Sequence, residues 1–257
     1  MKIGKTEKYI NERLDIEGSM ISIIIDPLDW PSPDAAISAG RQACEAGADI
    51  IAVGGSIGAQ GELLDVVTSG IKEVSNVPVV LFPGNIGTIT RFADAIYFMS
   101  LLNSRNPYWI SQAQMLAAPI LHRMGIEPLP IGYIVVAPGG TVGWVGDANL
   151  IPRDKPAIAA ALALSGEYSG SRIIFTDAGS ASKEGPVPIE MVEAVSKAIS
   201  IPYLVAGGIR TPQQAADIIR AGADWVQVGT AAEKAKDTKK VVEAFVKAVK
   251  AEGKARA

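Results

Sequence analysis

Short apolar segments alternate with longer amphipathic stretches along most of this chain. Eight segments rich in β-branched residues are predicted to form strands, at residues 20–27, 49–55, 78–85, 95–102, 130–137, 172–179, 202–208 and 225–230. Several of them are almost continuously apolar, which is typical of parallel strands buried on both faces. The stretches between them repeat apolar residues at intervals of three and four, as helices that cover a sheet do.

Eight strands with intervening helices favour a closed parallel barrel over an open sheet. The chain has 257 residues, and one (β/α)8 barrel takes about 250. We therefore predict an α/β protein of the TIM-barrel class, with one domain over residues 1–257 and a short N-terminal helix.

Residues 138–156 interrupt the alternation with four glycines and three prolines. They follow the fifth strand, so we expect a loop that covers a substrate or contacts a partner.

The composition is that of a globular protein, with 48% hydrophobic and 20% charged residues. A net charge of -3 provides no basic surface for nucleic acid. Cys44 and His122 are single residues of their types, so a zinc site is nearly excluded. We expect Cys44 to be a small buried side chain and His122 to lie near the end of a helix. The first 18 residues are polar and do not resemble a signal peptide, and no apolar run reaches about 20 residues, so we expect a cytoplasmic protein.

Glycines follow the last two predicted strands. The seventh strand ends at Gly207 and Gly208, just before a helix, and the eighth ends at Gly229 and Thr230. Glycine lets the backbone approach a ligand closely and direct its amide hydrogens at it. Amides at these two strand ends, with a helix N-terminus, form the phosphate site of many barrels. Tight turns alone would also use glycine, but glycine turns after two adjacent strands favour a phosphate site. Arg210 would add positive charge to this site, although a solvated side chain at the start of a helix is equally expected there.

Polar side chains end three other predicted strands. Asp177, after the sixth strand, is suited to binding a substrate hydroxyl and taking its proton, although a turn aspartate is equally expected there. Asp26 and Ser56 end the first two strands, which are neighbours in a barrel. A carboxylate and a hydroxyl at adjacent strand ends can hold Mg²⁺, which adds water and substrate phosphate oxygens as ligands. The pair by itself is a weak signal, because aspartate is common in turns.

Several long segments resemble those of one known family. They are LFPGN at 81–85, AIYFMSLLNSRNPYWI at 95–110, PLPIGYIVVAPGGTVGWVGDA at 128–148, IPRDKP at 151–156 and AGGIRTP at 206–212. They are similar to geranylgeranylglyceryl phosphate synthases of the archaeal type, over nearly the whole chain. The resemblance implies a Mg²⁺-dependent prenyltransferase that joins geranylgeranyl diphosphate to sn-glycerol 1-phosphate, making the first ether bond of archaeal membrane lipids. It also implies a homo-oligomer, often a hexamer, and surface contact with the membrane that takes up the lipid product.

The resemblance assigns site residues to the same strand ends. It places the metal ligands at Asp26 and Ser56. It places the glycerol phosphate segment, with Asp177 as the catalytic group, at Phe175, Thr176, Asp177, Ala178, Gly179, Ser180 and Ala181. The backbone phosphate clamps fall at Gly207, Gly208, Gly229 and Thr230. The prenyl tail needs an apolar groove, for which the candidates are Tyr97, Phe98, Tyr108, Trp109 and Tyr133, although core or subunit contacts would explain the same residues.

Four positions depart from the pattern of that family. Its first aspartate is usually followed by Pro-Asp-Lys, whereas Asp26 is followed by proline, Leu28 and Asp29, so a cation for diphosphate is absent there. Phe175 replaces the family's tyrosine, and Asp177 is shorter than the family's glutamate. Two alternatives therefore stay open. One is another phosphate-binding barrel enzyme, such as a sugar-phosphate isomerase or a flavin oxidoreductase. The other is a catalytically impaired barrel that serves as a binding or assembly module.

Overall fold

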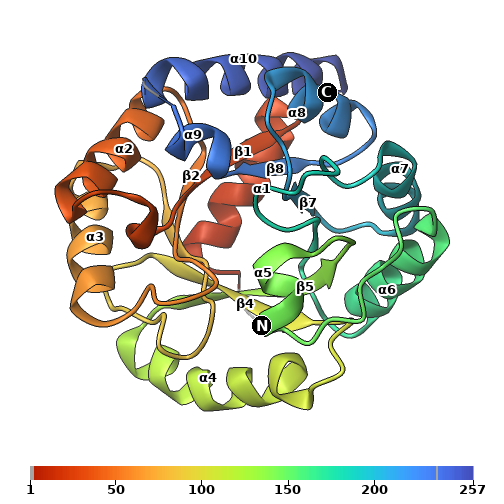
Figure 1. Cartoon of the computed structure of the whole chain (residues 1–257), viewed down its shortest axis with the longest axis horizontal. Coiled ribbons are helices and arrows are strands. Elements are labelled where there is room, and N and C mark those ends of the chain that lie inside the picture. Colours follow the sequence, from red (N-terminus) through yellow and green to blue (C-terminus); the bar gives the residue numbers. More distant parts are fainter. Residues whose placement is uncertain (1–2, 236, 257) are drawn as a thin grey trace.

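A closed barrel of eight parallel strands forms the centre of the molecule, with the strands hydrogen-bonded in chain order (Figure 1). The computed structural model describes residues 3–235 and 237–256. The strands are β1 Met20–Ile25, β2 Ile50–Val53, β3 Val79–Leu81, β4 Ala95–Leu101, β5 Glu127–Val135, β6 Ile173–Asp177, β7 Tyr203–Ala206 and β8 Trp225–Val228. The predicted (β/α)8 barrel is confirmed, and each strand overlaps a predicted segment.

Strand β5 begins at Glu127, before the residue 130 expected from the sequence. Its first residues pair with β4 alone, because pairing with β6 starts at Ile131. Pro128 therefore lies where the strand has one neighbour, and Pro130 lies where contact with the β6 side begins, its carbonyl accepting from the Arg172 amide at 2.8 Å. A missing amide hydrogen is tolerated at such an edge. The two prolines concealed this part of the strand in the sequence.

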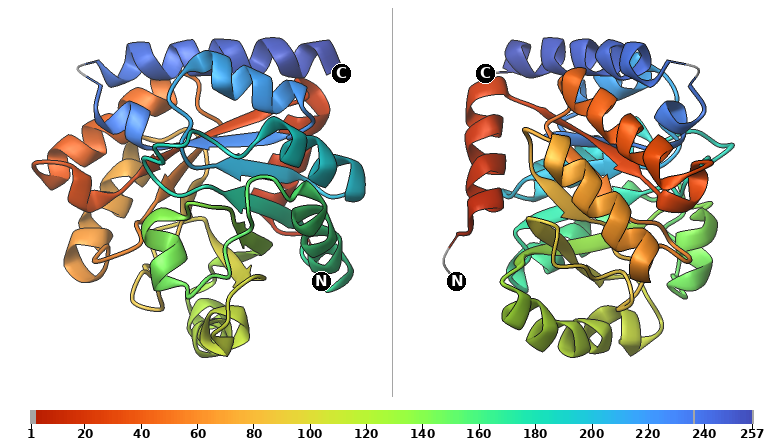
Figure 2. Two further views of the ribbon diagram at one scale, coloured as in Figure 1. Left: turned by 45° about the vertical axis from the view of Figure 1, so that its right-hand side comes forward. Right: turned by 90° about the vertical axis from the view of Figure 1, so that its left-hand side faces the viewer.

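Helices cover the outside of the barrel and alternate with the strands (Figure 2). The longer ones that follow β1 are α2 Pro33–Glu45, α3 Gly61–Val74, α4 Ala113–Met124, α6 Pro156–Tyr168, α7 Ile189–Ala198, α8 Pro212–Arg220 and α10 Thr238–Arg256. Shorter elements are the 3₁₀ helix η1 Pro27–Asp29, the π-helix η2 Tyr108–Gln112, and the helices α5 Gly140–Val145 and α9 Thr230–Glu233. Elements η1, α5 and α9 follow β1, β5 and β8, so they stand at the carboxyl ends of these strands.

Helix α5 corrects the expectation that residues 138–156 form a loop throughout. Its Gly143 amide donates to the Gly139 carbonyl at 3.0 Å, and Val142 and Leu150 pack against the core inside the barrel. A side chain at position 143 would displace Leu150, because an added Cβ would lie 2.9 Å from the end of the Leu150 side chain. The glycines that suggested a loop therefore allow a short helix to pack closely over the barrel.

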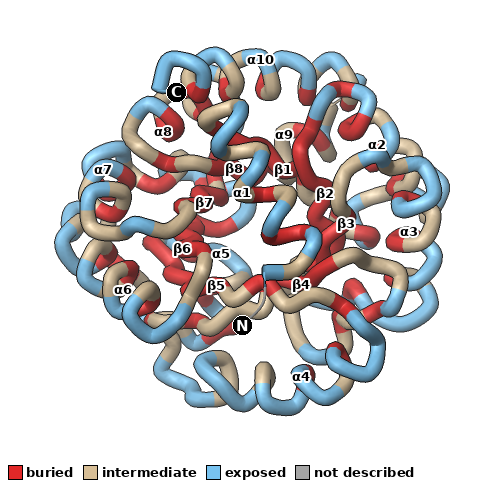
Figure 3. The backbone as a smooth tube through the Cα atoms, turned by 180° about the vertical axis from the view of Figure 1, so that it is seen from behind, coloured by how far each residue is buried: buried red, intermediate tan, exposed pale blue. Residues whose placement is uncertain are grey.

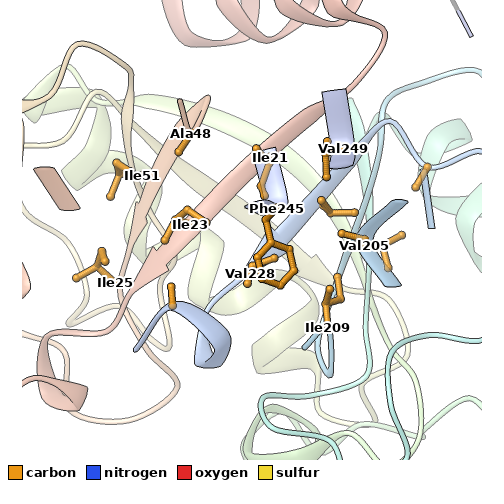
Figure 4. Packing of buried hydrophobic residues seen from close by; sticks show 14 of the residues in the cluster. Ile21, Ile23, Ile25, Ala48, Ile51, Val205, Ile209, Val228, Phe245 and Val249 are labelled. Carbon is orange, nitrogen blue, oxygen red and sulfur yellow. The ribbon is translucent and has the colours of Figure 1, made fainter. Parts of the chain in front are cut away.

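Two apolar layers hold the barrel together. The outer layer lies between strands and helices, where Ile23 of β1 and Val228 of β8 lie beside Phe245 of α10 (Figure 4). The inner layer fills the barrel and includes Tyr97 and Trp225, which are fully buried. Accordingly, Figure 3 shows buried strands at the centre and exposed outer faces on the surrounding helices.

The single cysteine and histidine take the expected places. Cys44 is buried in the outer layer, and its Sγ lies 3.3 Å from the Ser75 hydroxyl. His122 lies in the last turn of α4 and is exposed. A basic side chain there interacts favourably with the negative end of the helix dipole.

Helix α1, Lys5–Glu17, lies across the amino-terminal end of the barrel (Figure 2). The amides of Thr6 and Glu7 in its first turn donate to the Glu127 carboxylate at 2.7 and 2.9 Å. Ile10, on the same helix, packs against the inner layer. The helix therefore covers one end of the barrel and leaves the carboxyl ends of the strands open at the other.

A buried ion cluster joins α1, β1 and α10 through Asp49, which is 0% exposed. Its carboxylate accepts hydrogen bonds from the Ile21 amide at 2.8 Å, from Lys250 at 2.9 Å and from Arg13 at 3.0 Å. We expect Asp49→Ala to lower the free energy of unfolding by about 3–5 kcal/mol, because it leaves a largely buried lysine without its counter-ion. Urea unfolding at pH 7 measures this change.

The matched control is Glu12→Ala, which removes an exposed ion pair with Lys8 on the surface of α1. We expect it to change the free energy of unfolding by less than about 0.5 kcal/mol. An equally small effect of Asp49→Ala would contradict the role given to the buried cluster.

Candidate active site

The carboxyl ends of β1, β2, β6, β7 and β8 surround a polar cavity of about 380 Å³. Of the predicted site residues, those that line it are Asp26, Ser56, Asp177, Ser180, Ala181, Gly207, Gly208, Gly229 and Thr230. Parallel strands in a barrel all end on one face, which is why residues far apart in the sequence meet here.

The other predicted residues near the end of β6 do not line this cavity: Phe175, Thr176, Ala178 and Gly179. Phe175 points into the barrel, and its ring centroid lies 4.7 Å from that of Tyr133. The Thr176 hydroxyl lies 2.8 Å from the Tyr203 hydroxyl, and Ala178 belongs to the outer apolar layer. The side chains of Phe175, Thr176 and Ala178 therefore pack around the cavity instead of facing it.

Asp177 presents a buried carboxylate to the cavity and is 6% exposed. The Tyr133 hydroxyl donates to its Oδ2 at 2.7 Å, and the Gly179 amide donates to its Oδ1 at 2.6 Å. Burial raises the pKa of Asp177 above the ordinary aspartate value, and the two hydrogen bonds offset part of that rise. The carboxylate is thus held in one orientation by two donors, and each of its oxygens keeps a lone pair for a further hydrogen bond.

Backbone amides line the side of the cavity formed by β7 and β8. None of the amide nitrogens of Gly207, Gly208, Gly229 and Thr230 has a hydrogen-bond partner within residues 3–235 and 237–256. Gly207 has a φ of +80°, and an added Cβ would lie 2.3 Å from Asp177 Oδ1, so only glycine fits there. Unpaired amides at two adjacent strand ends are suited to binding an anion.

An apolar groove adjoins the polar cavity. Its walls come from the loop after β3, from β4, and from η2, α4 and α5, and they include Ile86, Ile89, Phe98, Met99, Trp109, Ala113, Ala117 and Val145. The residues that line both the groove and the polar cavity are Gly55, Ser56, Phe82, Tyr133 and Val142. A ligand with an apolar tail and a charged head could therefore lie across the boundary between them.

The five aromatic candidates for this groove are not equivalent. Tyr97, Phe98, Trp109 and Tyr133 line it, whereas Tyr108 does not. Tyr108 instead packs edge-on against Trp109, with ring centroids 5.0 Å apart. Its role is therefore to support the groove wall.

Comparison with known proteins agrees with this geometry. Residues 21–249 match the model of the PcrB family. The chain is 53% identical to the geranylgeranylglyceryl phosphate synthase of Pyrococcus horikoshii over 236 residues, which are 92% of each chain. It is 51% identical to that of Thermococcus kodakarensis over 243 residues, or 95% of each chain. The chain belongs to the PcrB family.

The solved structures support the same assignment for this PcrB-family barrel. It matches the crystal structure of (S)-3-O-geranylgeranylglyceryl phosphate synthase from Thermoplasma acidophilum, in complex with substrate sn-glycerol-1-phosphate. The TM-score is 0.91 at 37% identity, and the match covers 97% of this chain and 100% of the other. The family resemblance read from the sequence is therefore confirmed.

The end of the cavity near β1 is acidic in this PcrB-family barrel. Oδ1 of Asp26 accepts a hydrogen bond from the Leu28 amide at 3.0 Å, whereas Oδ2 has no partner among the described residues. Burial raises the pKa of Asp26 to about 6, and the charge of Asp29 adds to the rise. Burial also raises the pKa of Glu233 to about 7, with further contributions from Asp29 and Asp26. Ionising each of these carboxylates therefore costs free energy, and a nearby cation would reduce that free energy.

This acidic end suits a hard divalent cation held partly by substrate. Within the described part of the chain, no three His, Cys, Asp or Glu side chains gather into a cluster that could hold a metal ion. Mg²⁺, however, commonly takes one or two carboxylates and completes its shell with water and phosphate oxygens. Asp26, with an unpaired oxygen, and Ser56, on the wall of the same cavity, fit that mode of binding.

Three residues of this PcrB-family site have roles that the sequence did not indicate. Tyr133 was expected in the groove, but its hydroxyl also holds the carboxylate at the end of β6. Glu233 lies in the short helix α9, which the sequence did not indicate. Arg210 lines the cavity, but its guanidinium donates to the carbonyls of Ala181 and Ser182 at 3.1 and 2.7 Å. It therefore supports the loop after β6.

Proposed function

We propose that this PcrB-family protein is a geranylgeranylglyceryl phosphate synthase. It joins geranylgeranyl diphosphate to sn-glycerol 1-phosphate and releases diphosphate. The observation that carries the proposal is the shared boundary between an anion-binding cavity, which contains a buried carboxylate, and an apolar groove. The identity of about half the residues with synthases of that name supports the same pair of substrates.

The acceptor, sn-glycerol 1-phosphate, occupies the polar cavity. The amides of Gly207, Gly208, Gly229 and Thr230 bind its phosphate, since they have no hydrogen-bond partner among the described residues. One glycerol hydroxyl then lies beside Asp177, which accepts its proton as the hydroxyl oxygen attacks. Tyr133 and the Gly179 amide keep this carboxylate in position throughout.

The donor lies across the boundary, with its prenyl tail in the apolar groove and its diphosphate in the polar cavity. The allylic carbon forms a bond to the glycerol oxygen as its bond to diphosphate breaks, and the hydroxyl proton passes to Asp177. Asp26 and Ser56 would hold Mg²⁺, which supplies positive charge for the leaving diphosphate. The groove excludes water from the allylic carbon, so that the glycerol hydroxyl is the available nucleophile.

Contacts in the structure compensate for two departures from the family pattern, Phe175 and Asp177. Phe175 has no hydroxyl, but Tyr133 on the neighbouring strand packs against it and donates to Asp177. Asp177 is shorter than glutamate, yet two hydrogen bonds hold it at the cavity wall. These contacts support catalysis rather than a barrel that has lost its reaction.

The first test is product formation from sn-glycerol 1-phosphate and geranylgeranyl diphosphate. We expect an ether product with Mg²⁺, none with EDTA, and recovery when Mg²⁺ is added in excess. Binding of sn-glycerol 1-phosphate without product at any Mg²⁺ concentration would refute the synthase and support a phosphate-binding barrel with a changed or lost reaction.

The groove also predicts a change in donor preference. Ala113, at the start of α4, lines the groove, and a phenylalanine there would occupy part of it. We expect Ala113→Phe to lower kcat/KM for geranylgeranyl diphosphate about tenfold or more, and to affect the shorter geranyl diphosphate less. Ala118→Phe, on the exposed side of the same helix, is the control. Equal losses with both donors would argue against this groove as the tail site.

The expected homo-oligomer, a hexamer by the resemblance, remains a prediction. It is supported by exposed apolar side chains on η2 and α4, namely Ile110, Met115, Leu116 and Met124. In the part of the chain that the structure describes, no helix is long and apolar enough to cross a membrane. Contact with a membrane surface and a cytoplasmic location also remain predictions.

A further inference from the structure

Strand β8 carries a buried amide with an unused nitrogen. Gln227 is 1% exposed, and its Nε2 has no hydrogen-bond partner in the described part of the chain. Its Oε1, in contrast, accepts from the Ser22 hydroxyl at 3.0 Å and from the Tyr97 hydroxyl at 2.9 Å. A buried amide donor without a hydrogen-bond partner destabilises the folded protein, so a glutamine at this position needs an explanation.

The neighbouring side chains contact the oxygen of the Gln227 amide and leave its nitrogen unpaired among the described residues. The Trp225 indole, which is a donor only, donates to the Ser22 oxygen at 2.9 Å. The Ser22 hydroxyl in turn donates to Gln227 Oε1. Burial raises the pKa of Tyr97, so its hydroxyl stays protonated and donates to the same oxygen. Both acceptor positions of Oε1 are therefore filled, and the two hydrogens of Nε2 remain for a ligand.

Gln227 is also part of the wall of the polar cavity. The sheet register pairs Asp177 with Ala206, and Ala206 with Gln227. All three line the cavity, and the small Ala206 side chain leaves space between the carboxylate and the amide. Gln227 precedes the Gly229 amide by two residues, or about 6.6 Å along a strand. The amide thus lies one layer deeper in the barrel than the phosphate-binding backbone.

From these contacts we infer that Gln227 recognises a hydroxyl oxygen of the polyol phosphate acceptor. Its Nε2 donates to one carbinol oxygen of the glycerol chain, while the phosphate is held above by the Gly229 amide. Asp177, on the other side of Ala206, faces the same chain. The network of Ser22 and Tyr97 prepares this donor before the substrate enters. The inference rests on the proposed function and adds a residue that selects for hydroxyl groups.

The test compares ligands that differ by one hydroxyl. Binding of sn-glycerol 1-phosphate, of 1,2-propanediol 1-phosphate and of 1,3-propanediol 1-phosphate is measured by calorimetry for the wild type and for Gln227→Met. We expect the substitution to raise the Kd for sn-glycerol 1-phosphate about tenfold, as the loss of one hydrogen bond implies. For the analogue that lacks the recognised hydroxyl, wild type and variant should bind equally well.

Two further variants separate recognition from folding. Gln227→Leu also removes the Nε2 donor but has a different shape, and it should show the same pattern of three Kd values as Gln227→Met. Tyr203→Phe removes a buried hydroxyl that pairs with Thr176 away from the cavity, and it should leave all three Kd values unchanged.

The possible outcomes are distinct. A loss confined to ligands that carry one particular hydroxyl supports the inference. An equal loss for all three ligands, or no loss for any, overturns it while leaving the proposed synthase intact. Failure of the wild type to bind sn-glycerol 1-phosphate overturns both.

Discussion

Replacing Asp177 by asparagine is expected to lower kcat/KM by about 10²–10⁴-fold, because the variant cannot accept the proton of the attacking hydroxyl. Asparagine has nearly the same shape, and its carbonyl can still accept the Tyr133 or Gly179 hydrogen bond seen in the structure. Binding of sn-glycerol 1-phosphate should therefore change far less than turnover. Steady-state kinetics and calorimetry on the same preparation measure both quantities. Asparagine and aspartate enzymes of equal activity would exclude proton transfer to this residue.

The pH dependence gives a second readout of the same group. The reaction needs ionised Asp177, and burial raises its pKa above the ordinary value, so kcat/KM should rise with pH through that raised pKa. Tyr133→Phe removes a hydrogen bond that stabilises the carboxylate, so the pKa should rise further. The acid limb of the profile should then move to higher pH. A profile that keeps its position in the variant would contradict the role of Tyr133.

The second large effect is expected at the metal position. Asp26→Asn should lower kcat/KM about 100-fold or more and raise the Mg²⁺ concentration needed for half-maximal activity, because Mg²⁺ loses its carboxylate ligand. For the wild type, the Mg²⁺ requirement should increase as pH falls through about 6, since protons then compete for Asp26. Asp29→Asn, at a neighbouring carboxylate of the same cavity, is the control, and its effect should be smaller. An unchanged Mg²⁺ requirement in Asp26→Asn would refute this metal position.

Stability should change in the opposite direction from activity. The pKa of Asp26 in the folded protein is about 6, above the ordinary value of 3.8, so the folded state binds this proton more tightly than the unfolded state. The stability that proton binding by Asp26 adds to the folded state is fully present below pH 3.8 and is lost as the pH rises toward 6. Asp26→Asn removes the ionised carboxylate, so thermal unfolding above pH 6 should occur at a higher temperature than in the wild type. A variant that is more stable but less active is typical of a functional position.

The amino-acid sequence alone determined the barrel and the face that carries the site. Parallel strands buried on both faces appear as continuous apolar runs, and eight such runs with amphipathic stretches between them leave few other folds. The ends of these runs also locate Asp26, Asp177 and the glycines of β7 and β8, because all carboxyl ends of a parallel barrel lie on one face. These features depend on local pattern, which is why they could be predicted.

Contacts between strands were decided by the tertiary structure alone. Tyr133 reaches Asp177, and Gln227 reaches Ser22 and Tyr97, through the register of strands that lie far apart in the sequence. The local pattern does not encode register across a barrel, nor which inward side chains share a layer. The pKa shifts of buried carboxylates, and the boundary between groove and cavity, likewise arise only when distant elements exclude water together.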